Sequence, residues 1–466
     1  MTEIVSSINS VLNALVWGLP MMGLIIGVGL YFSIRTGFPQ LRKFGYAMKN
    51  TVGKVFSGGG KAEKGALSPF QALTTALAGT VGTGNIAGVA GAISLGGPGA
   101  VFWMWASSFL GMATKYAEIL LAVKFRRRSP TGEWIGGPMY YITDGLGRSF
   151  RWLAVFFALA GAAAALGMGN MAQVNTAAES AVSLAGAFSG QGGVTAQGEM
   201  LIRLGTGFVF ALASALVLLG GMKSVGAVTE KLVPAMSVLY ILGAALIIGA
   251  NFEKAGAALG TIVSGAFRPE AVLGGGLGAG LSQSLRYGIG RGVFSNEAGL
   301  GSSPIAHASS SETDPAAQGL YGIFEVFADT TVICTLTALA ILMSGAPVPY
   351  GVSTGAELTI SAFETGFGAR AAAAFISAET ALFALATVLS WALYGSRCVE
   401  FIFGTRVTGA YKAVYIAFIV IGAVLHMALV WEISDTLNGL MAIPNLIAIL
   451  ALSGHVVRAT KAHFGK

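Results

Sequence analysis

Stretches of about 18 or more mostly apolar residues recur along the chain from Val11 almost to its C-terminus. A helix of roughly 20 such residues is long enough to cross the hydrocarbon core of a bilayer, which is about 30 Å thick. Only 11% of the 466 residues are charged, whereas a soluble domain carries about 25%. No segment is polar enough to form a separate soluble domain. We therefore expect residues 1–466 to form a single all-α integral membrane domain.

The apolar stretches predict about eleven transmembrane helices. They lie at 11–33, 69–95, 99–123, 152–182, 202–221, 225–250, 273–300, 318–344, 372–396, 411–430 and 436–456. We interpret the first as an extra N-terminal helix and the other ten as two sets of five, at 69–250 and 273–456. A further amphipathic segment at 353–367 is too polar to span and is expected to be a surface or lid-like helix.

Basic residues are distributed unevenly among the loops. With the N-terminus outside, 21 of the 28 Lys and Arg residues fall in cytoplasmic segments and four in external ones. This bias is the usual sign of orientation in a membrane protein, and it also explains the net charge of +7 without a nucleic-acid partner. We expect a multi-pass protein of a bacterial or archaeal plasma (inner) membrane, with its N-terminus outside and its C-terminus in the cytoplasm.

The second span contains a cluster that weakens a regular helix. Gly79, Gly82 and Gly84 fall within six residues and are interleaved with Thr80 and Thr83. Each glycine costs helix stability, and irregular backbone at membrane depth is tolerated only where it lines a cavity enclosed by protein. The pattern predicts a break in this helix.

The seventh span contains a second cluster. Gly288, Gly290 and Gly292 precede the polar run Ser295-Asn296-Glu297. Here the sequence predicts a second break, at 288–296. The two breaks fall in the first helix of each set of five, and interruptions at matching places in two halves indicate a transporter binding site.

Broken helices expose peptide dipoles at half depth. One half-helix offers free N–H groups and the other offers free carbonyls. We expect the N–H groups of Thr83, Gly84 and Asn85 to bind a substrate carboxylate, and carbonyls around Gly290 to bind its ammonium group. An amino acid carries both charges, so it matches both ends.

The ninth span supplies hydroxyl groups for a small cation. Thr387 and Ser390 lie three residues apart on one helical face, next to Trp391. With carbonyls of the first break they would form an oxygen cage. Either hydroxyl could instead donate to a preceding carbonyl of its own helix, as is common in membrane helices.

Four longer motifs resemble one family of transporters. They are GTVGTGNIAGVA at 79–90, GGPGAVFWMW at 96–105, GGPMYYITDGLG at 136–147 and RGVFSNEAGLGSSPIAHA at 291–308. Together they are similar to the alanine or glycine:cation symporter family. The resemblance implies sodium- or proton-driven uptake of alanine or glycine, on a leucine-transporter-type 5+5 inverted repeat with one extra N-terminal helix.

The resemblance also implies which residues line the site. The substrate pocket would contain Thr83, Gly84, Asn85, Phe294, Ser295, Asn296 and Trp391, with Gly290 added by the dipole argument above. The sodium site would contain Thr80, Val81, Gly84, Thr387 and Ser390.

Other classes of function fit the sequence poorly. The two cysteines and four histidines are scattered, which predicts neither a zinc site nor a nucleophile–base constellation, and so no enzyme. The run 82–87 matches a dinucleotide fingerprint only formally, because membrane helix flanks it, and we expect no organic cofactor. No obligatory protein partner is evident. A passive channel would need pore-lining rings and no enclosed site, whereas two broken helices at matching places favour a transporter.

Several questions stay open on the sequence. They are the preference for alanine or glycine, the acceptance of D-isomers, the oligomeric state, and whether sodium or a proton is the coupling ion and in what number. The role of five ionisable residues within or beside the spans is also open, namely Glu179, Arg291, Glu325, Asp329 and Glu379.

Overall fold

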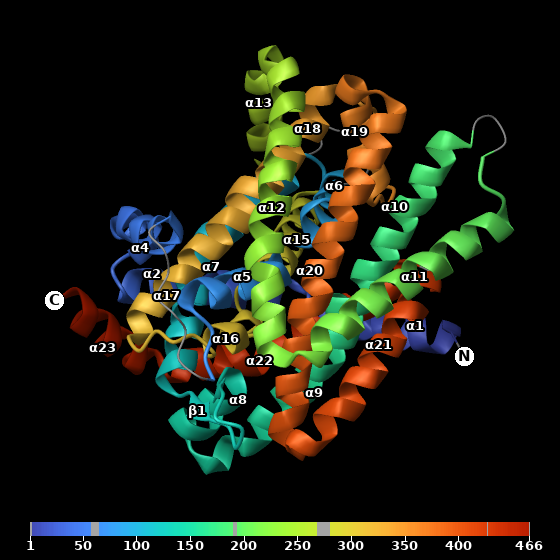
Figure 1. Cartoon of the computed structure of the whole chain (residues 1–466). Helices are drawn as coiled ribbons and strands as arrows, with labels where there is room; N and C mark the ends of the chain where they lie inside the picture. The colour runs from blue at the N-terminus through green and yellow to red at the C-terminus, as the bar shows by residue number, and fades with distance from the viewer. Residues whose placement is uncertain (1, 57–64, 190–192, 268–279, 426, 466) are drawn as a thin grey trace.

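The computed structural model describes residues 2–56, 65–189, 193–267, 280–425 and 427–465. These residues form an almost entirely helical molecule, with one antiparallel pair of two-residue strands, β1 (Arg127–Arg128) and β2 (Trp134–Ile135). In Figure 1 the helices α13, α18 and α19 lie at the top of the molecule, and β1 and α8 lie at the bottom. We call these ends the α19 side and the α8 side.

The elements follow one another with short connections. Up to residue 124 they are α1 (Thr2–Val16), α2 (Leu19–Arg35), α3 (Pro39–Arg42), α4 (Phe44–Phe56), α5 (Pro69–Thr80), η1 (Thr83–Asn85), α6 (Ala87–Gly96) and α7 (Gly99–Lys124). After the strands come α8 (Pro138–Tyr141), η2 (Ile142–Leu146), η3 (Arg148–Phe150), α9 (Arg151–Leu166), η4 (Gly167–Met171), α10 (Ala172–Phe188), α11 (Ala196–Leu219), α12 (Gly221–Ala250), η6 (Phe252–Lys254) and α13 (Ala255–Phe267). The rest are α15 (Leu281–Asn296), α16 (Ser303–His307), α17 (Pro315–Val326), η7 (Phe327–Cys334), α18 (Thr335–Ser344), α19 (Ala356–Phe367), α20 (Ala369–Phe403), η8 (Thr405–Val407), α21 (Thr408–Val424), α22 (Met427–Ala451) and α23 (Ser453–Phe464).

Many of these helices are long and apolar enough to cross a bilayer. The described residues contain eight such helices, or nine when the bent pair α5 and α6 is taken as one span. Two predicted spans, 99–123 and 273–300, are not among them. The first forms the helix α7, and the second contains α15 together with residues 273–279, which lie outside the described part of the chain. The protein is thus a multi-pass membrane protein, while the count of eleven and the two-fold repeat remain predictions.

The first predicted break is present. Helix α5 ends at Thr80, Val81 and Gly82 leave helical geometry, and α6 resumes at Ala87 after a single 3-10 turn. The two segments meet at an angle of 55°. The glycine and threonine cluster therefore ends one helix and begins another, as the sequence indicated.

The second break lies further along the chain than the sequence predicted. Residues 288–296 belong to the regular helix α15, so the expectation of free carbonyls around Gly288 to Gly292 was wrong. Two of these glycines serve close packing: a Cβ on Gly288 would lie 2.4 Å from the Ala100 carbonyl oxygen of α7, and one on Gly292 would lie 2.6 Å from the Ser107 hydroxyl. Small residues allow membrane helices to approach in this way.

The chain leaves the helix at Glu297 instead. Glu297 adopts a left-handed conformation with φ of 56°, and Gly299 and Gly301 follow with φ of 93° and 78°. The short helix α16 starts only at Ser303. The irregular stretch 297–302 is completely buried, so this second break is also enclosed by protein.

Helix α20 runs through the middle of the molecule as one uninterrupted helix of 35 residues. It packs against α5, α9, α10, α12 and α19 (Figure 1). It therefore carries the ninth-span residues Thr387, Ser390 and Trp391 past the first break.

Candidate functional site

The first break is held open by side chains from other helices. The Thr83 N–H and hydroxyl both lie 3.0 Å from the Gln173 Oε1 atom of α10, and the Asn85 N–H donates to the Gly82 carbonyl at 3.1 Å. Two of the three N–H groups expected to bind a carboxylate are thus already engaged. A bound carboxylate would have to take the place of the Gln173 amide oxygen or bind at Gly84.

Asn85 connects the break to a second helix. Its Oδ1 accepts from the Gly82 N–H at 2.9 Å, and its Nδ2 donates to the Asp329 carboxylate at 2.7 Å. Its backbone carbonyl accepts from the Thr337 hydroxyl at 2.8 Å. The Asn85 side chain therefore stabilises the irregular backbone from one side and binds a carboxylate with the other.

Asp329 joins the first break to the end of α15. Its second carboxylate oxygen accepts from the hydroxyls of Ser295, at 2.8 Å, and Thr330, at 2.7 Å. Asn296 donates to the Thr330 hydroxyl at 3.1 Å. All of these side chains are buried. We call Asn85, Asp329, Ser295 and Thr330 the carboxylate seam.

Trp391 of α20 touches both breaks as well. Its Nε1 lies 2.8 Å from the Glu297 carboxylate and 3.4 Å from the Gly79 carbonyl. Gly169 in η4 leaves the space that the indole fills, because a Cβ there would lie 2.2 Å from Trp391. The other Glu297 oxygen accepts from the Ser302 hydroxyl at 2.5 Å. Glu297 therefore pairs with Trp391 and Ser302.

Phe294 covers the first break. A Cβ on Gly84 would lie 3.4 Å from its ring, and on its other side the ring stacks on Trp431 of α22 with centroids 5.0 Å apart. The space beside Gly84 is therefore small and bounded by an aromatic face, which suits a side chain of very few carbon atoms.

The residues predicted to bind sodium lie together at the end of α5. A Cβ on Gly82 would lie 2.5 Å from the Thr387 hydroxyl oxygen, and one on Gly79 would lie 3.1 Å from that of Ser390. Both hydroxyls are engaged: Thr387 donates to Phe383 within its own helix at 3.1 Å, and Ser390 donates across to Thr75 at 2.6 Å. A hydroxyl that donates its proton keeps its lone pairs, so it can still coordinate a cation.

Two cavities lie above the breaks on the α19 side. One, of 490 Å³, is lined by Gly290, Arg291, Trp431 and Asp435 among others, and the other, of 250 Å³, by Gly88, Arg291 and Thr354 among others. The Arg291 guanidinium lies 3.3 Å from the Asp435 carboxylate between them. Gly290 therefore lies in the wall of an approach to the site, away from the buried residues predicted with it.

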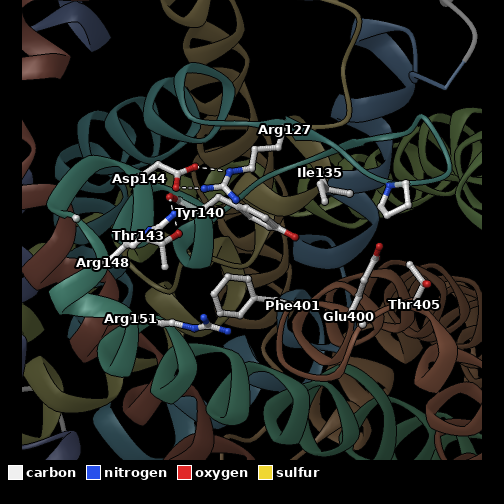
Figure 2. A pocket seen from close by; sticks show the side chains of 13 residues that line it. Arg127, Ile135, Tyr140, Thr143, Asp144, Arg148, Arg151, Glu400, Phe401 and Thr405 are labelled. Atoms are coloured by element: carbon white, nitrogen blue, oxygen red, sulfur yellow. Dashed lines mark hydrogen bonds and ion pairs between the residues drawn. The ribbon is translucent and has the colours of Figure 1, made fainter.

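A third cavity lies on the opposite side. It has a volume of 1020 Å³ and is lined by Arg127, Tyr140, Arg148 and Glu400 among others. Figure 2 shows the Arg127 guanidinium paired with the Asp144 carboxylate at its edge. None of its lining residues belongs to either break, so volume alone does not mark the site here.

Comparison with known proteins decides the family. The model of the sodium:alanine symporter family matches residues 1–466. The chain belongs to this family. The sodium/alanine symporter AgcS of Methanococcus maripaludis is 44% identical over 464 residues, covering 99% of this chain and 97% of that protein. The probable sodium/glutamine symporter GlnT of Bacillus subtilis is 36% identical over 465 residues, covering 99% and 91%.

A solved structure shares the fold of this family member. The crystal structure of MhsT in complex with L-phenylalanine superposes with a TM-score of 0.57, covering 84% of this chain and 99% of that chain, at 14% identity. At this identity the likeness concerns the fold alone. The family is one of symporters, and the relatives given above are named as symporters rather than enzymes.

Sequence reasoning did not assign three side chains that the structure places at the breaks. Gln173 binds Thr83, Asp329 joins the two breaks, and Glu297 binds Trp391. Each is a polar residue within an apolar stretch, which is a signal for function in a membrane. What the sequence could not give was the partner of each one.

Proposed function

We propose that this symporter couples inward sodium movement to uptake of alanine or glycine by alternating access. The observation that carries the proposal is the carboxylate seam, in which the buried Asp329 carboxylate accepts from Asn85 of the first break and from Ser295 at the end of α15. A cation or zwitterion that binds at either break alters the partners of the other, so the two breaks respond together.

The substrate pocket in this proposal lies around Gly84. The N–H groups of Thr83 and Gly84 bind the carboxylate once the Gln173 amide oxygen has left Thr83, and Asn85, whose N–H stays bonded to the Gly82 carbonyl, lines the pocket beside them. Asn296, Ser295 and the carbonyls at the end of α15 face the ammonium group, because the last four carbonyls of a helix have no partner within it. Phe294 and Trp391 limit the side chain to about the size of a methyl group, which favours alanine and glycine.

The sodium ion in this proposal binds at the end of α5. The backbone carbonyls of Thr80, Val81 and Gly84 and the hydroxyls of Thr387 and Ser390 supply hard oxygen ligands. Sodium bound there would tie α5 to α20, since the two hydroxyls belong to α20. Release of the ion would loosen that contact.

Closure toward the α19 side depends on Arg291 and Trp431. Arg291 pairs with Asp435 and lies 4.8 Å from the centre of the Trp431 ring, while Phe294 stacks on the same ring. These contacts lie between the two approach cavities and the break. We propose that they open to admit alanine and close behind it.

We place the protein in the plasma (inner) membrane of a bacterium or archaeon, with the N-terminus outside and the C-terminus in the cytoplasm. The distribution of Lys and Arg supports this orientation. The α19 side is then external, and the α8 side with its arginines is cytoplasmic.

Labelled alanine uptake into proteoliposomes tests the proposal. The vesicles contain potassium, and either sodium or potassium is supplied outside at the same pH and the same clamped membrane voltage. We expect accumulation only with the inward sodium gradient. Equal uptake in both salts would overturn sodium coupling.

One relative supports a second candidate, a proton-coupled carrier of small neutral amino acids. The putative sodium/proton-dependent alanine carrier protein YrbD of Bacillus subtilis is 34% identical over 99% of this chain. Uptake driven by an inward pH gradient in the absence of sodium would favour that candidate.

A further inference from the structure

Glu379 of α20 is a buried carboxyl group without a partner. Its exposed fraction is 0%, and within the part of the chain that the structure describes neither carboxyl oxygen has a hydrogen-bond partner. By contrast, the buried carboxylates of Asp329 and Glu325 each accept several hydrogen bonds. Glu379 therefore needs an explanation that the other two do not.

Aromatic residues flank Glu379 along its face of α20. Phe375 and Phe383 lie one helical turn before and after Glu379 on the same face of α20. Phe375 stacks on Phe363 of α19 with centroids 5.7 Å apart, and Phe383 lies 5.5 Å from Tyr240 of α12. Glu379 therefore shares its face of α20 with rings that belong to a buried apolar cluster between α20, α12 and α19.

Among the residues that the structure describes, no basic side chain forms an ion pair with Glu379. The titratable group that interacts with it electrostatically is Tyr240, whose hydroxyl is bonded to Thr337 at 2.6 Å. On α19, Glu357 binds the Gly355 N–H and Glu364 is exposed. On α10, Glu179 faces the cavity that Arg291 lines.

Burial of an ionised carboxylate without a partner is strongly unfavourable, so the group is tolerated there only in its neutral form. We propose that Glu379 is a proton-binding site, which holds its proton in this conformation and releases it only when water reaches this face of α20. The step is the dissociation of one proton from the carboxyl group to water, and its reversal completes the cycle.

Two routes link this site to the first break. Thr387, a proposed sodium ligand, lies eight residues further along α20, which is about 12 Å along the helix axis. On the other side of Tyr240, the Thr337 hydroxyl donates to the Asn85 carbonyl at 2.8 Å. A change of charge at Glu379 therefore acts on the helix and the hydrogen bonds that hold the break.

The direction in which pH changes alanine uptake follows from the proposal that the Glu379 carboxyl group is neutral in this conformation. A conformation that retains the proton is favoured at low pH and is depleted as the pH rises. Because every transport cycle passes through it, we expect alanine uptake at a fixed sodium gradient to fall as the pH is raised.

The test compares the wild type with Glu379→Gln, which keeps the shape and fixes the group in a neutral state. Glu364→Gln, at an exposed position on α19, is the matched control. We expect the infrared difference between wild type and Glu379→Gln to contain a carboxylic-acid C=O band at neutral pH. We also expect Glu379→Gln to lose the pH dependence of uptake, and Glu364→Gln to keep it.

Absence of that band, or the same pH dependence in wild type and Glu379→Gln, would overturn the proposal. Should Glu379→Gln fail to fold, Glu379→Met serves in its place, because no hydrogen bond is lost. The uptake measurement rests on the proposed function, whereas the infrared measurement does not, so a failure of sodium symport and a failure of the proton site remain distinguishable.

Discussion

The two breaks differ in what their glycines do. At the first break, Gly82 and Gly84 lie in the irregular backbone itself, beside Thr387 and Phe294. At the second, Gly288 and Gly292 lie inside a regular helix that packs closely on α7, and the chain turns only at Glu297. A glycine cluster in a membrane helix is thus either an interruption of the helix or a close crossing with another helix, and what decides between them is whether a neighbouring helix packs against the glycines.

The largest effect is expected at Asp329, where the two breaks meet. Asp329→Asn replaces a carboxylate that accepts from Asn85 and Ser295 with an amide that must present a donor to one of them. Hydrogen bonds to a charged group contribute about 1.5–3 kcal/mol each, so we expect alanine affinity to fall by about 100-fold. Binding by calorimetry on purified protein measures this, with Asp144→Asn on the α8 side as the control. Unchanged affinity would show that the breaks act independently.

A pair of glycine variants tests whether the second cluster serves the close crossing of α15 with α7. Gly288→Ala would place its Cβ 2.4 Å from the Ala100 carbonyl oxygen, whereas Gly290→Ala would meet nothing within 4 Å. We expect Gly288→Ala to lower stability by about 1–3 kcal/mol, as overpacking does, and Gly290→Ala to leave it unchanged. Thermal unfolding in detergent is the measurement. Equal melting temperatures would argue that the close crossing with α7 is not required.

The first break is probed by Thr387→Ala. Loss of one proposed oxygen ligand, worth about 1–1.5 kcal/mol, should raise the sodium concentration for half-maximal uptake by about tenfold. Thr387→Ser should retain wild-type behaviour, because it keeps the hydroxyl. Sodium titration of alanine uptake distinguishes the two, and matching curves for the Ala and Ser variants would exclude a ligand role.

The smallest effect is expected at the approach to the site. Asp435→Asn removes an ion pair with Arg291 that is partly exposed to solvent, and such pairs contribute at most about 1 kcal/mol. We expect a change in uptake rate of no more than a few-fold, with alanine affinity unaltered. A large loss of affinity would instead place Arg291 in direct contact with the substrate.

Much of this molecule could be predicted from the sequence. The apolar stretches located the helices, and the Gly79 to Asn85 cluster located the first break, because glycine and hydroxyl residues disfavour a lipid-facing helix. The second break was misplaced by several residues because the sequence of 288–296 cannot show that α7 lies against those glycines.

The site was predicted in part for the same reason. Thr387 and Ser390 are on one helical face, which spacing alone predicts. The Thr83–Gln173 and Asn85–Asp329 contacts join residues 90 and 244 positions apart. No local pattern encodes such distances, so the partners of Gln173, Asp329 and Glu297 emerge only when the chain is folded.

Helix α20 has 35 residues, so it is about 52 Å long, well beyond the hydrocarbon thickness of about 30 Å. Its two ends therefore reach the aqueous phases on opposite faces of the membrane, while its middle carries Thr387 and Trp391. Reporter groups attached near Arg370 and Phe403 would measure the movement of the two ends of α20. If α20 tilts about its middle during transport, the two reporters should move in opposite directions. If α20 stays fixed, only the broken helices change position.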